Sequence, residues 1–199
     1  MVDHSDTILG KETAYIDQYE ASLLFPIPRS KARVTGDQDA SFLGGDLWTA
    51  YEISWLNPQG LPQVVIGEFW FRCDSQSIVE SKSFKLYLNS LIQTQYSDRE
   101  ALRQVLVADL SRVTGSLVDA VLYDVSEYNG FNPIGELQGI CLDQQKVLID
   151  TYQPKPDFLS SAGVDGSLVE ECLYSHLLKT NCPVTNQPDW ASVYINYKG

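Results

Sequence analysis

Apolar residues first form a regular pattern near residue 46, where two stretches rich in aromatic and β-branched side chains flank a short segment of turn-forming residues. The stretches are residues 47–56 and 64–71, and Pro58, Gly60 and Pro62 lie between them. Aromatic and β-branched residues favour strands, whereas proline and glycine favour turns. The pattern therefore predicts an antiparallel hairpin.

The spacing becomes helical over residues 80–95, where Phe84, Leu88 and Leu91 fall on one face. A second helix is predicted directly afterwards, because Ser97 and Glu100 have the spacing of a capping box. Its buried stripe and its C-terminal stop are expected at Leu102, Val105, Leu106, Leu110, Val113 and Gly115.

Strand-like sequence returns after the helices, at residues 118–128 and 146–152, with a segment rich in glycine, proline and asparagine between them. These strands complete a β-β-α-α-β-β unit, so we expect an α+β fold with an antiparallel sheet and both helices on one face. The polar residues 1–40 are interpreted as an extension that wraps this domain. The first unit is therefore predicted to span residues 1–153.

A second and shorter pattern follows a linker at residues 154–166. Residues 168–178 and 191–197 predict another hairpin, equivalent to the first but with a longer loop between its strands. Its aromatic face, made of Trp190, Tyr194 and Tyr197, has no helices of its own unit to pack on. We expect residues 154–199 to form an incomplete second unit that self-associates through this hairpin or stays mobile.

Charge and composition narrow the classes of partner. The formal net charge is −12, from 14 Lys and Arg against 26 Asp and Glu, and this disfavours binding to nucleic acid or to an anionic membrane. The short basic run at residues 29–33 is interpreted as a solvated loop. Residues 1–6 have neither the basic start nor the apolar core typical of a signal peptide, and no apolar run approaches the roughly 18 residues of a membrane span. We expect a soluble, cytoplasmic protein.

The cysteines show no CxxC spacing, and the chain is too large to need disulfides for stability. We therefore expect reduced thiols. The chain has two histidines, so a Cys/His zinc site is not expected and no metal is assigned. The four cysteines are Cys73, Cys141, Cys172 and Cys182.

Cys182 lies seven residues before Asp189, in a segment that Pro183 and Pro188 bracket and that we predict to be a folded loop. A thiol is the best side-chain nucleophile at neutral pH, although with a pKa of about 8.5 little of it is ionised. An ionised carboxyl nearby raises the pKa of a thiol, so Asp189 is predicted to act as a neutral acid. The alternative is that Cys182 is a small buried apolar residue.

Residues 80–87 carry a second candidate site, because the N-terminus of a helix binds anions. Lys82 and Lys85 share a helix face and supply local positive charge, which predicts a site for a phosphorylated dinucleotide. Glu80 has a carboxylate that can pair with a guanine-type edge. The alternative is a solvated helix face that Phe84 anchors.

The stretches ESKSFKLY at residues 80–87 and NCPVTNQPDW at residues 181–190 resemble the signature motif and the catalytic loop of the NADPH-dependent 7-cyano-7-deazaguanine reductases. These are the nitrile reductases of queuosine biosynthesis, a tRNA modification. The position of the loop after the motif is similar to that in the long, two-unit subfamily. The resemblance implies the tunnelling fold, in which tandem β-β-α-α-β-β units pair into barrels, and we expect a homo-oligomer, a dimer.

The resemblance also implies roles for individual residues. It implies that Cys182 is the nucleophile and that Asp189 is the general acid. The signature motif implies that Ser81, Lys82 and Lys85 contact NADPH, and that Glu80 and Ser81 border the substrate. The implied reaction reduces the nitrile of 7-cyano-7-deazaguanine to the primary amine with two NADPH, through a thioimide on the cysteine.

The sequence is expected to depart from the family pattern in one respect, and two alternative functions stay open. Family members continue past the second hairpin into helices with a His-Glu pair that grips the deazaguanine ring, and we expect this chain to lack them. A truncated, non-catalytic remnant that serves as an assembly module is one alternative. The other is a pterin enzyme of the cyclohydrolase type, against which the scarcity of histidine argues.

Overall fold

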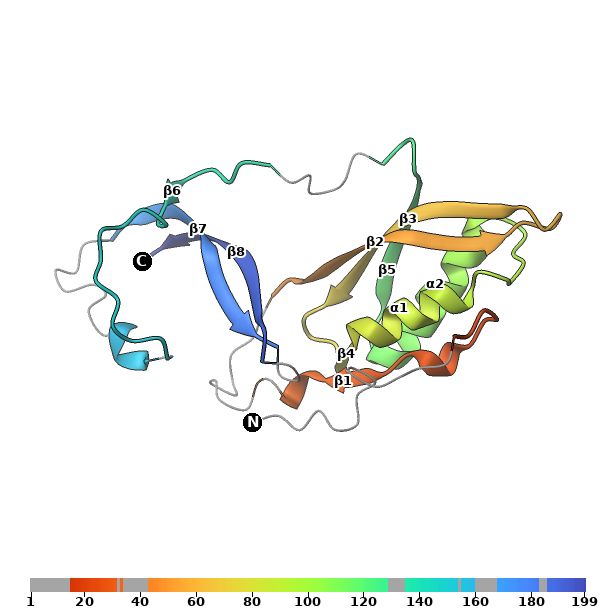
Figure 1. Ribbon diagram of the computed structural model, residues 1–199, viewed down its shortest axis with the longest axis horizontal. Helices are drawn as coiled ribbons and strands as arrows, with labels where there is room; N and C mark the ends of the chain where they lie inside the picture. The colour runs from red at the N-terminus through yellow and green to blue at the C-terminus, as the bar shows by residue number, and fades with distance from the viewer. Residues whose placement is uncertain are drawn as a thin grey trace. The chain divides into compact units, whose positions relative to one another are not determined.

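The computed structural model describes residues 15–31, 33, 43–128, 135–153, 155–159, 168–182 and 186–199 (Figure 1). The chain divides into two compact units, Met1–Gly130 and Phe131–Gly199. Residues 131–153, which the sequence pattern assigns to the first unit, group with the second unit.

The first unit is built on an antiparallel sheet with the strand order β2-β3-β5. The predicted hairpin and the strand after the helices form this sheet, as β2 (Gly45–Leu56), β3 (Pro62–Arg72) and β5 (Val118–Asp124). A small second sheet pairs β1 (Pro26–Pro28) with β4 (Ser77–Val79). Strand residues alternate between two faces, and one face of β3 presents Val65, Phe69 and Phe71 to the core.

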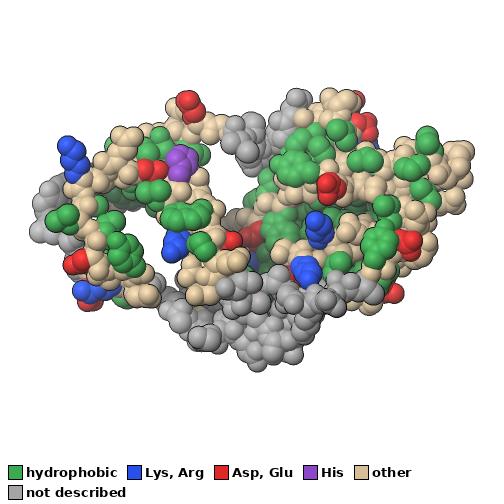
Figure 2. Space-filling view, in the orientation of Figure 1, with side chains coloured by type: hydrophobic (Ala, Val, Ile, Leu, Met, Phe, Trp, Pro, Cys, Tyr) green, Lys and Arg blue, Asp and Glu red, His purple; other side chains and the backbone are tan. Residues whose placement is uncertain are grey.

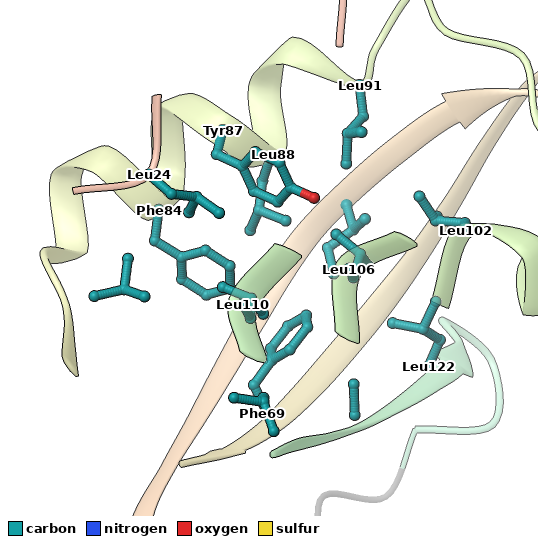
Figure 3. Packing of buried hydrophobic residues seen from close by; sticks show 14 of the residues in the cluster. Leu24, Phe69, Phe84, Tyr87, Leu88, Leu91, Leu102, Leu106, Leu110 and Leu122 are labelled. Atoms are coloured by element: carbon teal, nitrogen blue, oxygen red, sulfur yellow. The ribbon is translucent and has the colours of Figure 1, made fainter. Parts of the chain in front are cut away.

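Both predicted helices form and cover this face of the sheet, as α1 (Ser81–Ser90) and α2 (Arg99–Thr114). Figure 3 shows Phe84 of α1 and Leu106 of α2 in one cluster with Phe69 of β3. The rings of Phe69 and Phe84 meet edge to face with centroids 5.1 Å apart. An antiparallel sheet with both helices on one face confirms the expected α+β class.

The start of α2 differs from the prediction. Asp98 is the N-cap, and its Oδ1 accepts a hydrogen bond from the Ala101 N–H at 2.8 Å. The carboxylate of Glu100 instead binds Arg103 at 2.7 Å, so the capping box between Ser97 and Glu100 is wrong. A carboxylate one residue after the serine provides the acceptor, and the arginine three residues on competes for the glutamate.

Most of the rest of α2 agrees with the sequence, except that Val105 of the predicted stripe is not part of the core cluster, whereas Val107 packs against it. The helix ends at Gly115, whose φ of 69° is the left-handed conformation that glycine tolerates. Leu102, Leu106 and Leu110 are fully buried, and Val113 is partly buried against them.

The segment before β2 packs on the first unit. The Phe25 N–H donates to Ser83 Oγ on α1 at 3.0 Å, in agreement with an extension that wraps the domain. Arg29 is not in a solvated loop: its side chain is 13% exposed and its guanidinium binds Asp46 Oδ2 at 2.5 Å. It also donates to Ser75 Oγ at 2.9 Å. The interpretation of the basic run as solvent-exposed is therefore wrong for this arginine.

The second unit contains a hairpin of β7 (Glu170–Asn181) and β8 (Pro188–Lys198), with the short β6 (Ile140–Cys141) parallel to β7. Within the described residues 135–153, the strand expected at residues 146–152 does not form. Its Val147, Leu148 and Ile149 are 63%, 103% and 63% exposed. Strand-forming residues need a sheet edge to pair with, and local sequence alone does not supply one.

The two hairpins repeat one geometry. The strands β2 and β7 are each 12 residues long, and their partners β3 and β8 are each 11 residues long and begin with proline. The register shifts after Ala50 in β2 and after Ser175 in β7, which is the sixth residue of each strand. Each shift is a β-bulge with one extra residue. The predicted equivalence of the two hairpins is confirmed.

The surface of the second hairpin differs from that of the first. Trp190 and Tyr194 are 61% and 46% exposed on one face, whereas Tyr197 is 39% exposed on the other, because side chains alternate along β8. The expectation of a single aromatic face is thus wrong. Apolar side chains are visible at the surface of both units in Figure 2. The hairpin carries Leu177 and Leu178 as further exposed apolar residues.

Candidate active site

Glu80 caps α1 with its own side chain. Its Oε1 accepts the Lys82 N–H at 3.0 Å, and its Oε2 accepts the Ser83 N–H at 2.7 Å. The residue is 4% exposed. Because these two amides donate to the Glu80 carboxylate, they are not available to an anion in this conformation. Positive charge at this end of α1 comes from lysine side chains.

A cavity of about 460 Å³ lies between α1 and the bulged part of β2. Ser81 and Lys85, two of the predicted cofactor residues, both line it, whereas Lys82 and Glu80 are not among its lining residues. Lys82 is half-buried. The other lining residues come from both elements: Trp48, Thr49, Ala50, Tyr51, Glu52, Phe84, Leu88 and Asn89.

Sequence reasoning did not assign the β2 side of this cavity. Trp48 packs on Phe84 with ring centroids 5.9 Å apart, and Tyr51 stands at the bulge with 63% of its surface exposed. Asn89 was detectable from spacing, because it follows Lys85 by four residues on the same helix face. Aromatic rings, an amide and a cation in one concave site suit a ligand with a flat ring and a phosphate.

A buried carboxylate holds α1 in place. Asp109 of α2 accepts hydrogen bonds at Oδ2 from Tyr87 at 2.8 Å and from Tyr19 at 2.7 Å. Burial raises the pKa of Tyr19 to about 12, and burial also raises the pKa of Tyr87. Arg112 lies 3.4 Å from Asp109 Oδ1. The sequence signal for this anchor was an acidic residue next to Leu110, in the buried stripe of α2.

Cys182 and Asp189 lie at the tip of the β7–β8 hairpin. Asp189 belongs to β8 and pairs with Thr180, so it is not in the loop where the sequence placed it. The Cys182 N–H donates to the Gln187 carbonyl at 2.8 Å, which continues the ladder one step beyond β7. Pro188 opens the strand because a proline is tolerated at the first strand position.

This register makes the two predicted catalytic residues neighbours. Cys182 faces Gln187, and Asp189 stands two residues farther along β8, on the same face as Cys182. Such diagonal neighbours have Cα atoms roughly 7–8 Å apart. A thiol and a carboxyl at this separation can flank a small linear group. Cys182 is half-buried, and none of the four cysteines, all in described residues, forms a disulfide.

Two further properties concern cofactors and membranes. Among the described residues, no cluster of three or more His, Cys, Asp or Glu side chains suits a metal ion. No helix in the described part of the chain has the length and apolar character to cross a membrane.

Comparison with known proteins shows the family to which the chain belongs. Residues 15–122 match the family model described as nitrile reductase, 7-cyano-7-deazaguanine-reductase N-term. The NADPH-dependent 7-cyano-7-deazaguanine reductase of Teredinibacter turnerae is 46% identical over 200 residues, which cover 100% of this chain and 71% of that protein. The enzyme of the same name from Cupriavidus necator is 49% identical over 195 residues, covering 96% and 70%. The chain belongs to the 7-cyano-7-deazaguanine reductase family.

Proposed function

We propose that this chain reduces the nitrile of 7-cyano-7-deazaguanine to the primary amine 7-aminomethyl-7-deazaguanine with two NADPH, a step of queuosine biosynthesis. Membership of the reductase family supports the reaction. The observation that carries the mechanism is the diagonal pair of Cys182 and Asp189 at the hairpin tip. A pterin enzyme, the alternative within the same fold, has no support from these relatives.

Cys182 begins the reaction as a thiolate. Its sulfur adds to the nitrile carbon, one π bond of the C≡N group becomes a lone pair on nitrogen, and Asp189 gives that nitrogen a proton. The product is a covalent thioimide. An acid on the same strand face as the sulfur suits this step, because the nitrile nitrogen lies beyond the carbon that the sulfur attacks.

NADPH would supply, when bound, the two hydrides that the thioimide carbon and then the imine carbon take up. Cys182 must leave between these two reductions: the nitrogen lone pair forms the imine while the C–S bond breaks, and the sulfur departs as a thiolate. Sulfur serves both steps because it is a good nucleophile and a good leaving group. Two hydrides and two protons convert the nitrile into the amine.

The cavity on α1 fits part of the cofactor. Lys85 supplies a cation for a phosphate, Ser81 supplies a hydroxyl, and Trp48 supplies an aromatic surface for a ring. We assign Ser81, Lys82 and Lys85 to NADPH. A cavity of about 460 Å³ suits one half of a dinucleotide rather than the whole molecule.

Glu80 and Ser81 are assigned to the edge of the substrate site. Each carboxylate oxygen of Glu80 accepts one amide hydrogen bond of α1 and keeps a lone pair. Contact with a guanine-type edge would use those remaining lone pairs. We further propose that the protein is a cytoplasmic homodimer that binds no nucleic acid directly.

The test is covalent capture of the nitrile. The 199-residue chain is incubated with 7-cyano-7-deazaguanine, and its intact mass is measured. We expect one adduct per chain, its loss in Cys182→Ala, and its retention in the control variant Cys172→Ala. An adduct that survives in Cys182→Ala would overturn the assignment.

Asp189→Asn separates acid catalysis from binding. An amide does not supply the proton, so adduct formation at saturating nitrile should slow by about 100-fold while the half-saturating concentration changes little. Equal losses in both would indicate a positioning role for Asp189.

A non-catalytic assembly module is the second candidate function. The exposed apolar side chains on both faces of the β7–β8 hairpin favour it, because they offer a surface for another protein. Absence of any adduct on the unmodified chain would support this candidate over the enzyme.

A further inference from the structure

Asn186, in the described part of the hairpin loop, has an unusual backbone conformation. Its φ is 56°, and it is the one non-glycine residue with positive φ within the described part of the chain. This left-handed region is unfavourable for most L-residues, and asparagine tolerates it best after glycine. The loop therefore needs a residue of restricted type at this position.

The same residue binds the nucleophile through its backbone. The Asn186 N–H donates to the carbonyl oxygen of Cys182 at 2.9 Å. The Cys182 N–H is already used by the Gln187 carbonyl, so both backbone polar groups of the cysteine are held by the returning side of the loop. A rotation of the Asn186 backbone would release one of them.

The side chain of Asn186 adds a link across the loop. Asn181, the residue before the cysteine, donates from Nδ2 to Asn186 Oδ1 at 3.3 Å. Glycine would supply the left-handed backbone equally well but would lack this acceptor. Asparagine serves both purposes, because it tolerates the left-handed backbone and carries a side-chain acceptor.

We propose that Asn186 is a positioning residue for the Cys182 thiol, and that Asn181 assists it. This inference rests on the proposed function, in which Cys182 attacks the nitrile and Asp189 protonates it. The left-handed backbone and the amide link hold the cysteine in register with Gln187, and this register places the thiol on the same face as Asp189. Small misplacement of a nucleophile slows a reaction strongly, so the loop sets the rate of attack.

Substitutions at Asn186 separate the two contributions. Asn186→Ala loses both the favourable backbone and the acceptor, and we expect thioimide formation to slow by about tenfold. Asn186→Gly keeps the backbone and loses the acceptor, so its rate should fall by only about threefold. Asn181→Ala should match Asn186→Gly. Asn196→Ala, the same chemical change within β8 and away from the loop, should leave the rate unchanged.

A second measurement does not depend on the nitrile. Iodoacetamide alkylates cysteine thiolates, and peptide mapping gives the rate at Cys182 separately from the rates at the other three free cysteines. The charged side chains near the hairpin tip are Asp189 and Lys179, and Lys179 pairs with Trp190 on the opposite face. Asp189→Asn should change the alkylation rate of Cys182 by about twofold, because it alters the side chain diagonal to the thiol. In the Asn186→Ala background the same change should have a smaller effect.

These measurements decide whether Asn186 positions the Cys182 thiol. Coupling between Asp189→Asn and Asn186→Ala, together with slower capture in Asn186→Ala, supports the inference. An equal change of the alkylation rate in both backgrounds overturns it, and so does the absence of any change when Asn186 is present. If Asn186→Ala unfolds and Asn186→Gly does not, the coupling is measured in the Asn186→Gly background instead, and the same two outcomes apply. Coupling without nitrile capture would refute the proposed function and leave the positioning role standing.

Discussion

Among the single side chains of α1, Lys85 is the one whose removal should affect cofactor binding most. It lines the cavity on α1 and brings positive charge into a protein with a net charge of −12. We expect Lys85→Ala to weaken NADPH binding by about fivefold and to flatten its dependence on salt. Equilibrium titration at two ionic strengths measures both effects.

Two other lysines serve as comparisons for this prediction. Lys82→Ala should have a smaller effect on NADPH, because Lys82 is not among the lining residues of the cavity. Lys31→Ala removes an exposed lysine of the same unit and should have no effect. Affinity that responds equally to all three substitutions would indicate a general charge effect rather than a site.

Tyr87 is the residue through which α1 is anchored. Its hydroxyl donates to the buried carboxylate of Asp109, and Tyr87→Phe removes this hydrogen bond without changing the ring. We expect the free energy of unfolding to fall by about 1–3 kcal/mol, since a buried charged acceptor loses a donor. Urea unfolding measures the loss. Tyr152→Phe, at a residue that is 85% exposed, is the control and should change stability little.

At the scale of elements, the start of α2 distinguishes two ways of capping a helix. Asp98→Ala removes the acceptor for the Ala101 N–H and should destabilise the protein by about 1 kcal/mol. Ser97→Ala leaves that hydrogen bond in place and should cost only a few tenths of a kcal/mol. Thermal unfolding of the two variants compares them. A larger loss for Ser97→Ala would restore the capping box that the sequence predicted.

Elements that short-range interactions specify are predictable from the sequence, whereas elements that depend on distant segments are not. Both helices and both hairpins were predictable, because turn residues, helix stops and the spacing of residues such as Leu102 and Leu106 act over a few positions. The strand expected at residues 146–152 was not, because its formation requires an edge supplied by a distant segment. The bulges in β2 and β7 also had no local signal.

At the scale of the whole molecule, the two hairpins have the same backbone geometry but differ in how much of their apolar surface is buried. Helices bury the face of β3 that carries Phe69 and Phe71, whereas Ile195 and Tyr197 of β8 are 45% and 39% exposed. Amides in a sheet with little buried apolar contact open at low free energy. We expect amide hydrogens of β7 and β8 to exchange faster than those of β2 and β3 at low protein concentration.

Hydrogen exchange followed by mass spectrometry measures this difference, and sedimentation gives the mass of the assembly. Self-association that covers the second hairpin should raise its protection as the concentration increases. A monomer with equally strong protection in both hairpins would show that exposed apolar residues do not weaken the second one.

The candidate site shows the same division between local and tertiary information. The motifs at residues 80–87 and 181–190 were visible in the sequence, including the pair of Cys182 and Asp189. Their arrangement was not: the sequence assigned Asp189 to a loop, and the register of β7 and β8 placed it in a strand, two residues beyond the partner of Cys182. Pairing register depends on both strands and on the turn, so one segment does not determine it.

Local sequence specifies the elements and the chemical groups of this protein: two helices, two hairpins, the thiol of Cys182 and the carboxyl of Asp189. Tertiary structure alone decided that Trp48 joins Lys85 in one cavity, that Asp109 anchors Tyr87, and that residues 146–152 remain outside the first sheet. The physical reason is that propensities and caps act between neighbours in the chain, whereas cavities, buried charges and sheet edges arise between segments that only folding brings together.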